Sequence, residues 1–291
     1  MSRKMNLKSK MQTEIYKAYK YGKGVKRHEL KKQGKASKAI TSNNTYRQYC
    51  RNVSIFADWC KANNIKSMQV AEKEAPRYLQ ELADIGKANT TIKSYKSALG
   101  KCFGKEIDYE VGSCNRADVT NNRGSKESMK HINPDNYRDV LNLIGNCGAR
   151  KSEVAKATYK DKLHGIIDIK GSKVDGKIYV TIRGKGGKVR YAEWMGSKEA
   201  AQVLYKDWKN ARAGEPIYKC PNDLRTHRSR QKYAKKVYKA YARPISSLST
   251  KQKYICRKEM KGKVYDRYAL YKVQKNLGHN DLHCVTRYIF E

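Results

Sequence analysis

Apolar residues recur at helical spacing between residues 41 and 105. An apolar side chain on every turn gives a helix one face for a core, so three amphipathic helices are predicted here. Thr90 and Thr91, at the start of the third, are expected to act as N-caps. The three stripes are Tyr46, Tyr49, Val53, Phe56 and Cys60; Tyr78, Leu79, Leu82 and Ile85; and Ile92, Tyr95, Leu99, Cys102 and Phe103.

The segments on either side of this helical region lack such a period. Residues 1–40 carry 13 Lys and Arg against two acids, Glu14 and Glu29, and we expect a flexible basic arm with at most one frayed helix. Residues 106–130 are polar and rich in Asn, Gly and Ser, which predicts a linker.

The chain after the linker mixes two periods. Pro134 stands in the first turn of a predicted helix. Apolar and polar residues then alternate over 178–183, and a second strand at 189–194 follows the glycine-rich turn 184–188, which predicts a β-hairpin. Residues from 198 onward return to a mostly helical period. The predicted fold is therefore mainly α with a small β-hairpin or sheet (α+β), in two domains at 41–105 and 131–291.

Net charge is the property of the composition that says most about the partner of this protein. The 291 residues include 64 Lys and Arg against 27 Asp and Glu, so the formal net charge is +37. Hydrophobic residues still make up 39% of the chain, enough for packed cores, which argues against a disordered polycation. A polyanion is the expected partner, nucleic acid first and an anionic membrane second.

The sequence argues against a membrane protein, a secreted protein and a zinc-binding protein. No window approaches 18 consecutive apolar residues, and the N-terminus is charged where a secretory signal would be apolar, so an intracellular protein is expected. The eight cysteines include no CxxC pair, and they form no close group with histidine at the spacing of zinc ligands. This argues against a zinc module and against a disulfide framework.

Four separate motifs occur along the chain, and their order and approximate spacing match a known pattern. They are the segment 148–154 (GARKSEV), the hairpin tip 184–190 (GKGGKVR), the segment 227–234 (HRSRQKYA), and Leu277-Gly278-His279 with Tyr288 nine residues after the histidine. Together they resemble the tyrosine recombinase (phage integrase) family. By that resemblance 41–105 is a core-binding, DNA-binding domain and 131–291 a catalytic domain with a basic insertion at 235–275.

The resemblance implies a site-specific DNA recombinase or integrase of a mobile element. Such an enzyme cleaves and rejoins DNA through a 3′-phosphotyrosine intermediate, and Tyr288 would be its nucleophile. The implied partners are double-stranded DNA at attachment or recombination sites and three further copies of the chain, as a homotetramer on two duplexes. No cofactor, metal or membrane is implied, and the expected location is cytoplasmic, on the nucleoid.

The other implied catalytic residues act on the phosphate and on protons. Arg150 and Arg230 would hold the non-bridging oxygens, and His279 would hydrogen-bond the phosphate. His227 would assist proton transfer, while Lys185 would protonate the leaving 5′ oxygen.

These residue types suit the chemistry without reference to any family. A guanidinium stays protonated and offers a rigid fork of donors to phosphate oxygens. A tyrosine ester retains the energy of the broken bond, so rejoining needs no ATP. An unperturbed phenol has a pKa of about 10, and cationic neighbours would favour its phenolate form.

Two site assignments stay open at this stage. Lys188 flanks the same turn as Lys185 and is the alternative proton donor. Asn222 to Arg225 also resembles a His-x-x-Arg motif, with Asn in place of His, although Tyr233-Ala234 favours the register of 227 and 230. Glu153 is interpreted as structural, orienting basic neighbours.

Two questions of function also stay open. A non-catalytic sequence-specific DNA-binding protein would explain the charge equally well, and a type IB topoisomerase would use similar chemistry without strand exchange. The 235–275 insertion carries 13 Lys and Arg against Glu259 and Asp266, which suits either contact with the DNA backbone or assembly of protomers.

The spacing of His279 and Tyr288 makes a sharper prediction. Nine residues at about 100° each would place them on opposite sides of one continuous helix, where they could not share a phosphate. We therefore predict that Gly278 ends one helix and that His279 lies in a connection. Asn280 or Asp281 would then cap the helix that carries Tyr288.

Overall fold

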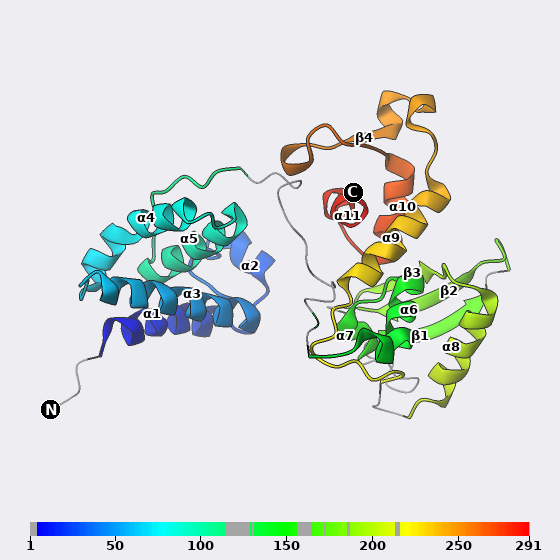
Figure 1. The fold of residues 1–291 in the computed structure, drawn as a ribbon, viewed down its shortest axis with the longest axis horizontal. Coiled ribbons are helices and arrows are strands. Elements are labelled where there is room, and N and C mark those ends of the chain that lie inside the picture. Colours follow the sequence, from blue (N-terminus) through cyan, green and yellow to red (C-terminus); the bar gives the residue numbers. More distant parts are fainter. Residues whose placement is uncertain are drawn as a thin grey trace. The chain divides into compact units, whose positions relative to one another are not determined.

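The computed structural model describes residues 5–113, 129, 131–155, 165–171, 173–184, 187–212 and 216–290. The chain divides into two compact units, Met1–Val119 and Thr120–Glu291 (Figure 1). The predicted linker at 106–130 lies largely outside the described residues, as does Lys185. Within the described ranges, no helix has the length and apolar character needed to cross a membrane.

The first unit is built from helices around one core. The three predicted amphipathic helices are confirmed, and Phe56, Leu79 and Leu99 of their apolar stripes are inaccessible to solvent. Ile85 is an exception, because it follows the second helix as its C-cap and is 67% exposed. The third helix begins at Asn89 and follows Ala88 without a side-chain cap, so the prediction that Thr90 or Thr91 caps it is wrong. The helices are α1 (Leu7–Gly22), α2 (Arg27–Lys32), α3 (Asn43–Ala62), α4 (Met68–Asp84) and α5 (Asn89–Phe103).

The predicted flexible arm is wrong for α1. Asn6 caps this helix by accepting a hydrogen bond from the Ser9 backbone N–H at 2.8 Å. Met11 and Ile15, one turn apart, are fully buried in the core that α3 also lines. The residues between them are polar, and Lys8, Lys10 and Lys17 flank the pair, so the apolar period is weak in the sequence. Burying two large apolar side chains contributes about 3–6 kcal/mol, enough to hold the helix on the core.

The second unit contains a three-stranded antiparallel sheet in the order β1-β2-β3. Its hairpin confirms the alternation predicted for 178–194, with Ile182 opposite Arg190 and Arg183 opposite Val189. A third strand, β1, pairs with the other edge of β2. The strands are β1 (Gly165–Gly171), β2 (Ile178–Arg183) and β3 (Val189–Glu193).

Helices α9, α10 and α11 pack together beside this sheet (Figure 1). Their core includes Val237, Val273 and Val285, all fully buried. Helix α9 also contacts α6, while α10 contacts β3, so several motifs far apart in the sequence meet at one place. The helices are the short 3-10 helix η3 (Pro134–Tyr137), α6 (Arg138–Cys147), α7 (Lys151–Val154), α8 (Lys198–Asn210), α9 (His227–Tyr241), α10 (Arg267–Leu277) and α11 (Leu282–Ile289).

The basic insertion has a folded part between α9 and α10. Arg243 pairs with the buried carboxylate of Asp266 at 2.8 Å, and the hydrogen bond from Arg243 lowers the pKa of Asp266 to about 2. Asp266 also caps α10 by accepting from the Tyr268 backbone N–H. The elements here are the 3-10 helices η5 (Ile245–Ser247), η6 (Thr250–Gln252) and η7 (Lys258–Met260) and a two-stranded sheet of β4 (Lys253–Ile255) and β5 (Val264–Asp266).

Candidate active site

The break between α10 and α11 brings His279 and Tyr288 together. Helix α10 ends at Gly278, whose φ of 68° is the left-handed conformation that glycine adopts without strain. His279 lies in the connection, and Asp281 caps α11 by accepting from the His283 backbone N–H at 2.9 Å. The predicted break is therefore confirmed, with Asp281 as the cap.

Tyr288 lies among three predicted catalytic side chains. The centroid of its ring is 5.2 Å from that of His227 and 5.4 Å from that of His279. The guanidinium carbon of Arg230 lies 5.6 Å from the same ring centroid. His227 begins α9 and Arg230 lies one turn later, so a single helix presents both to the tyrosine.

Arg230 is held by backbone carbonyls rather than by a carboxylate. It is only 4% exposed and donates to the carbonyls of Gly148 and Leu277. Burial lowers the pKa of its guanidinium to about 10, so the group stays charged at neutral pH. Its Nε is buried and has no acceptor among the described residues. An orphaned buried donor of this kind marks a place where a bound anion can complete the hydrogen bonding.

His279 is neutral in the free protein. Burial and the nearby positive charges of Arg230 and Arg150 lower the pKa of its imidazole to about 4. Its Nε2 lies 3.4 Å from an Nη of Arg230. A neutral imidazole keeps both a donor and an acceptor, so His279 can hydrogen-bond a phosphate oxygen through an N–H.

Arg150 is tied to a buried carboxylate. Glu153 is fully buried and accepts from the Arg150 side chain at 2.8 Å and from the Arg150 backbone N–H at 2.7 Å. Burial alone would raise the pKa of Glu153, but the hydrogen bonds and charges of Arg190 and Arg150 outweigh it and lower the pKa to about 2. The interpretation of Glu153 as structural is therefore confirmed.

Arg190 is the residue that the sequence analysis missed. It is 5% exposed, pairs with both oxygens of Glu153 at 2.9 and 2.6 Å, and donates to the Asn276 carbonyl at 3.1 Å. One signal was available, because strand alternation places Arg190 opposite Ile182, on the inward face of the hairpin. An arginine on that face indicates buried acceptors for its donors, of which a carboxylate also compensates the charge.

Comparison with solved structures supports the fold described above. No protein-family model matches the chain, and no curated protein matches its sequence. The XerH site-specific recombinase bound to its difH substrate is 15% identical with a TM-score of 0.52, and the match covers 98% of this chain and 91% of that one. At this identity the likeness establishes the fold. This chain has the tyrosine recombinase fold.

Two structures of the Tn1549 transposon integrase also match. The complex with transposon right-end DNA is 12% identical with a TM-score of 0.46, covering 99% of this chain and 95% of that one. The complex with a circular intermediate DNA is 13% identical with a TM-score of 0.48, covering 97% and 95%. The predicted fold class, mainly α with a small β-sheet (α+β), is confirmed.

The sequence alone leaves two assignments open: Lys185 or Lys188 as the proton donor, and 227–230 or 222–225 as the His-x-x-Arg motif. Lys185 lies outside the described residues, whereas Lys188 is exposed at the base of the hairpin tip and donates to Asn280 Oδ1 at 2.6 Å. The alternative motif that ends at Arg225 places that arginine in solvent, while Arg230 is buried beside Tyr288. This placement favours Arg230.

The buried ion-pair group makes a prediction about stability. In Glu153→Gln an amide nitrogen replaces one carboxylate oxygen, so two donors of Arg150 and Arg190 lose their acceptor and the buried negative charge is lost. We expect the free energy of unfolding to fall by about 3–5 kcal/mol. Urea denaturation measures it, with Asp135→Asn as control, because Asp135 is 68% exposed in its pair with Arg138 and should change stability by less than about 0.5 kcal/mol. Equal losses in both variants would contradict the assigned role.

The depressed pKa of His279 makes a prediction about pH. Below about pH 6.5 the unfolded chain binds a proton at this histidine, while the folded chain binds it only near pH 4. The free energy of unfolding should therefore fall as the pH drops from about 6.5 to 4. The Glu153 and Asp266 carboxyls contribute to acid unfolding only at lower pH.

Urea denaturation of His279→Gln at pH 7.5 and pH 5 isolates this effect. The variant should lose less stability between the two pH values than the natural chain. His28→Gln is the control, since that side chain is 66% exposed, and it should behave like the natural chain. An unchanged pH dependence in His279→Gln would show that another group takes up the proton.

Proposed function

We propose that this chain is a site-specific DNA recombinase that integrates or excises a mobile element. It cleaves and rejoins DNA through a 3′-phosphotyrosine intermediate. One observation carries the proposal: the ring centroid of Tyr288, on α11, lies 5.2 Å from that of His227 and 5.6 Å from the guanidinium carbon of Arg230, both on α9, and 5.4 Å from that of His279 in the connection before α11.

The proposed cleavage step is a substitution at phosphorus. The Tyr288 oxygen attacks, the bond from phosphorus to the 5′ oxygen breaks, and a 3′-phosphotyrosine and a free 5′ hydroxyl result. Arg230 and Arg150 stabilise the charge on the non-bridging oxygens, because guanidinium donors fixed in advance need no reorganisation during the reaction. His279 donates to the same phosphate.

Two protons must also move. His227 assists the loss of the Tyr288 proton, since its ring lies against the phenol ring. A lysine of the hairpin tip protonates the leaving 5′ oxygen, either Lys185, as the family pattern favours, or Lys188, which lies beside His279 in the lining of one groove. Rejoining reverses the step, as a 5′ hydroxyl attacks the phosphotyrosine and Tyr288 leaves. The reaction needs no ATP.

The proposed assembly is a homotetramer on two DNA duplexes, which recombination between two sites requires. The net charge of +37 suits a polyanionic partner and predicts steep dependence of binding on salt. The proposed location is the cytoplasm, on the nucleoid. The insertion that contains β4 and β5 either contacts the DNA backbone or couples the protomers.

A nicked suicide substrate tests the function. Duplexes that tile the DNA flanking the gene carry a nick near each possible cleavage position, so the cut fragment diffuses away and the covalent complex accumulates. We expect one duplex to give a band of slow mobility on a denaturing gel, with the DNA attached to Tyr288 in the digested protein. A protein that only binds DNA would give no such band. Covalent complexes without recombinant junctions between two sites would indicate a topoisomerase-like activity.

A further inference from the structure

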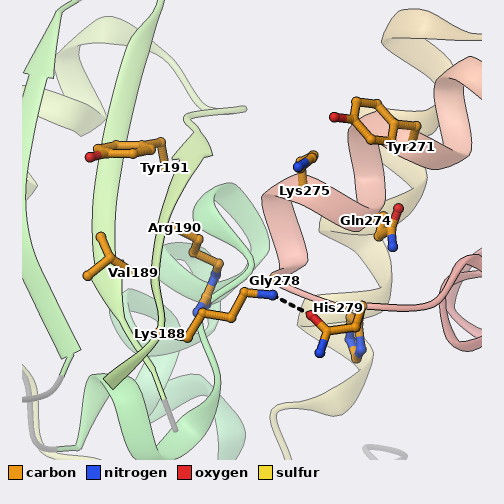
Figure 2. A pocket seen from close by; sticks show the side chains of 10 residues that line it. Lys188, Val189, Arg190, Tyr191, Tyr271, Gln274, Lys275, Gly278 and His279 are labelled. Carbon is orange, nitrogen blue, oxygen red and sulfur yellow. Dashed lines mark hydrogen bonds between the residues drawn. The ribbon is translucent and has the colours of Figure 1, made fainter. Parts of the chain in front are cut away.

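A groove runs from the candidate active site between β3 and α10. Its volume is about 460 Å³. His279, Lys188 and Arg190 lie at one end, and Tyr191 and Tyr271 lie towards the other, on β3 and α10 respectively (Figure 2). We call this the tyrosine groove. Its remaining lining residues are Val189, Gln274, Lys275, Gly278 and Asn280.

Two exposed aromatic rings distinguish this groove from a plain phosphate-binding surface. Tyr191 is 65% exposed and Tyr271 is 46% exposed. Tyr191 occupies an outward position of β3, between the buried residues Arg190 and Ala192, so strand alternation holds its ring on the open side. Large exposed aromatic surface that faces a groove is a feature of ligand-binding sites.

The charge of the tyrosine groove suits an anion. Lys188 and Lys275 line it, and its described lining includes no Asp or Glu. The Lys275 ammonium lies 5.1 Å from the centroid of the Tyr271 ring, which combines a cation with an aromatic face. Gln274 adds an amide that can hydrogen-bond the edge of a base.

We propose that the tyrosine groove binds an unpaired nucleotide of the DNA strand next to the cleaved phosphate. A base stacks on Tyr191 or Tyr271, and its phosphate contacts Lys188 and Lys275. A paired and stacked base hides both its faces, so a duplex would use the lysines but leave the tyrosine rings unused. Stacking on tyrosine requires a base that has left the helix.

The position of the groove fits this ligand. His279 lines the groove and also lies beside Tyr288, while Arg190 lines the groove and shares the Glu153 carboxylate with Arg150. A strand that is exchanged must unpair next to the cut, and its first free nucleotide would then lie within reach of the groove. This part of the inference rests on the proposed recombinase function, whereas preference for unpaired DNA can be measured without cleavage.

The test compares two DNA molecules of the same arbitrary sequence. One is fully paired, and the other has a short run of unpaired thymidines, because stacking on aromatic rings tolerates any base. We expect Tyr191→Ser and Tyr271→Ser to weaken binding of the unpaired DNA by about 5- to 100-fold and of the duplex by less than about 2-fold. Tyr191→Phe and Tyr271→Phe should restore binding, since phenylalanine keeps the stacking face.

The control is Tyr205→Ser. Tyr205 is 42% exposed on α8, and the Lys209 ammonium lies 5.9 Å from its ring centroid, so it reproduces the Tyr271 and Lys275 pair outside the groove. It should leave binding of both DNA molecules unchanged. A second measurement places the base: 5-iodouracil in the unpaired run should photo-crosslink to Tyr191 or Tyr271.

Equal losses for both DNA molecules, or crosslinks confined to other residues, would overturn the groove assignment. Either result would leave the proposed recombinase function standing, because neither assay involves cleavage. Conversely, selective loss of binding to unpaired DNA together with no covalent complex at Tyr288 would support the groove and refute the recombinase.

Discussion

Tyr288→Phe should abolish covalent attachment to DNA while leaving DNA affinity within a few-fold of the natural chain. The hydroxyl is the only group removed, and the proposed reaction has no bond to form without it. Binding depends on the charge of the whole chain, which the substitution does not alter. The variant should also fold normally, because the phenylalanine ring keeps the contacts of Tyr288 with His227 and His279.

Two assays on the same preparation separate these effects. Incubation with a suicide substrate measures covalent complex on a denaturing gel, and a filter or anisotropy assay measures affinity. Tyr205→Phe, an exposed tyrosine of α8, is the control and should retain both. Covalent complex that persists in Tyr288→Phe would refute Tyr288 as the nucleophile and require the search to turn to another tyrosine.

Arg150→Ala should slow cleavage by about 10²–10³-fold, the usual effect of removing one preorganised donor to a developing oxyanion, at ~2.7–4 kcal/mol. This arginine gives a cleaner test than Arg230, which also holds two backbone carbonyls inside the protein. When Arg150 is removed, Glu153 keeps both hydrogen bonds from Arg190, so no buried carboxylate is left without a partner. Single-turnover cleavage at saturating protein measures the effect.

Arg225→Ala is the matched control. Arg225 belongs to the alternative motif of 222–225 and is exposed, so its loss should leave the cleavage rate within a few-fold. Arg150→Lys should recover part of the rate, since it restores the charge but not the fork of donors. A large effect of Arg225→Ala with none of Arg150→Ala would show that the phosphate is held by a different set of arginines.

Local features of the chain were sufficient to predict most of the helices and strands and the break between α10 and α11 that places His279 near Tyr288. The stripes in α3, α4 and α5 and the alternation in β2 and β3 are periodicities within single elements, and burial follows them. The bend that joins His279 to Tyr288 also follows from local chemistry. Gly278 adopts a left-handed conformation and Asp281 can cap a helix, so the sequence within a few residues specifies the break.

Helix α1 shows where local periodicity fails. Its apolar face is narrow, and Met11 and Ile15 are separated by polar residues and flanked by lysines, a pattern that suggests an unstructured arm. The helix is stable because α3 and α5 cover those two side chains. That stabilisation comes from tertiary packing rather than from the helix itself.

Arg190 and the tyrosine groove depend entirely on contacts between distant segments. Arg190 and Glu153 are 37 residues apart in the sequence and form a buried ion pair. A short stretch of sequence does not contain both partners, so it cannot predict the pair. The groove exists because α10 packs against β3, about 80 residues earlier in the chain. Periodicity reports which face of an element is buried, but not which element covers it. The residues that only the folded chain reveals are therefore those whose partners lie far away in the sequence.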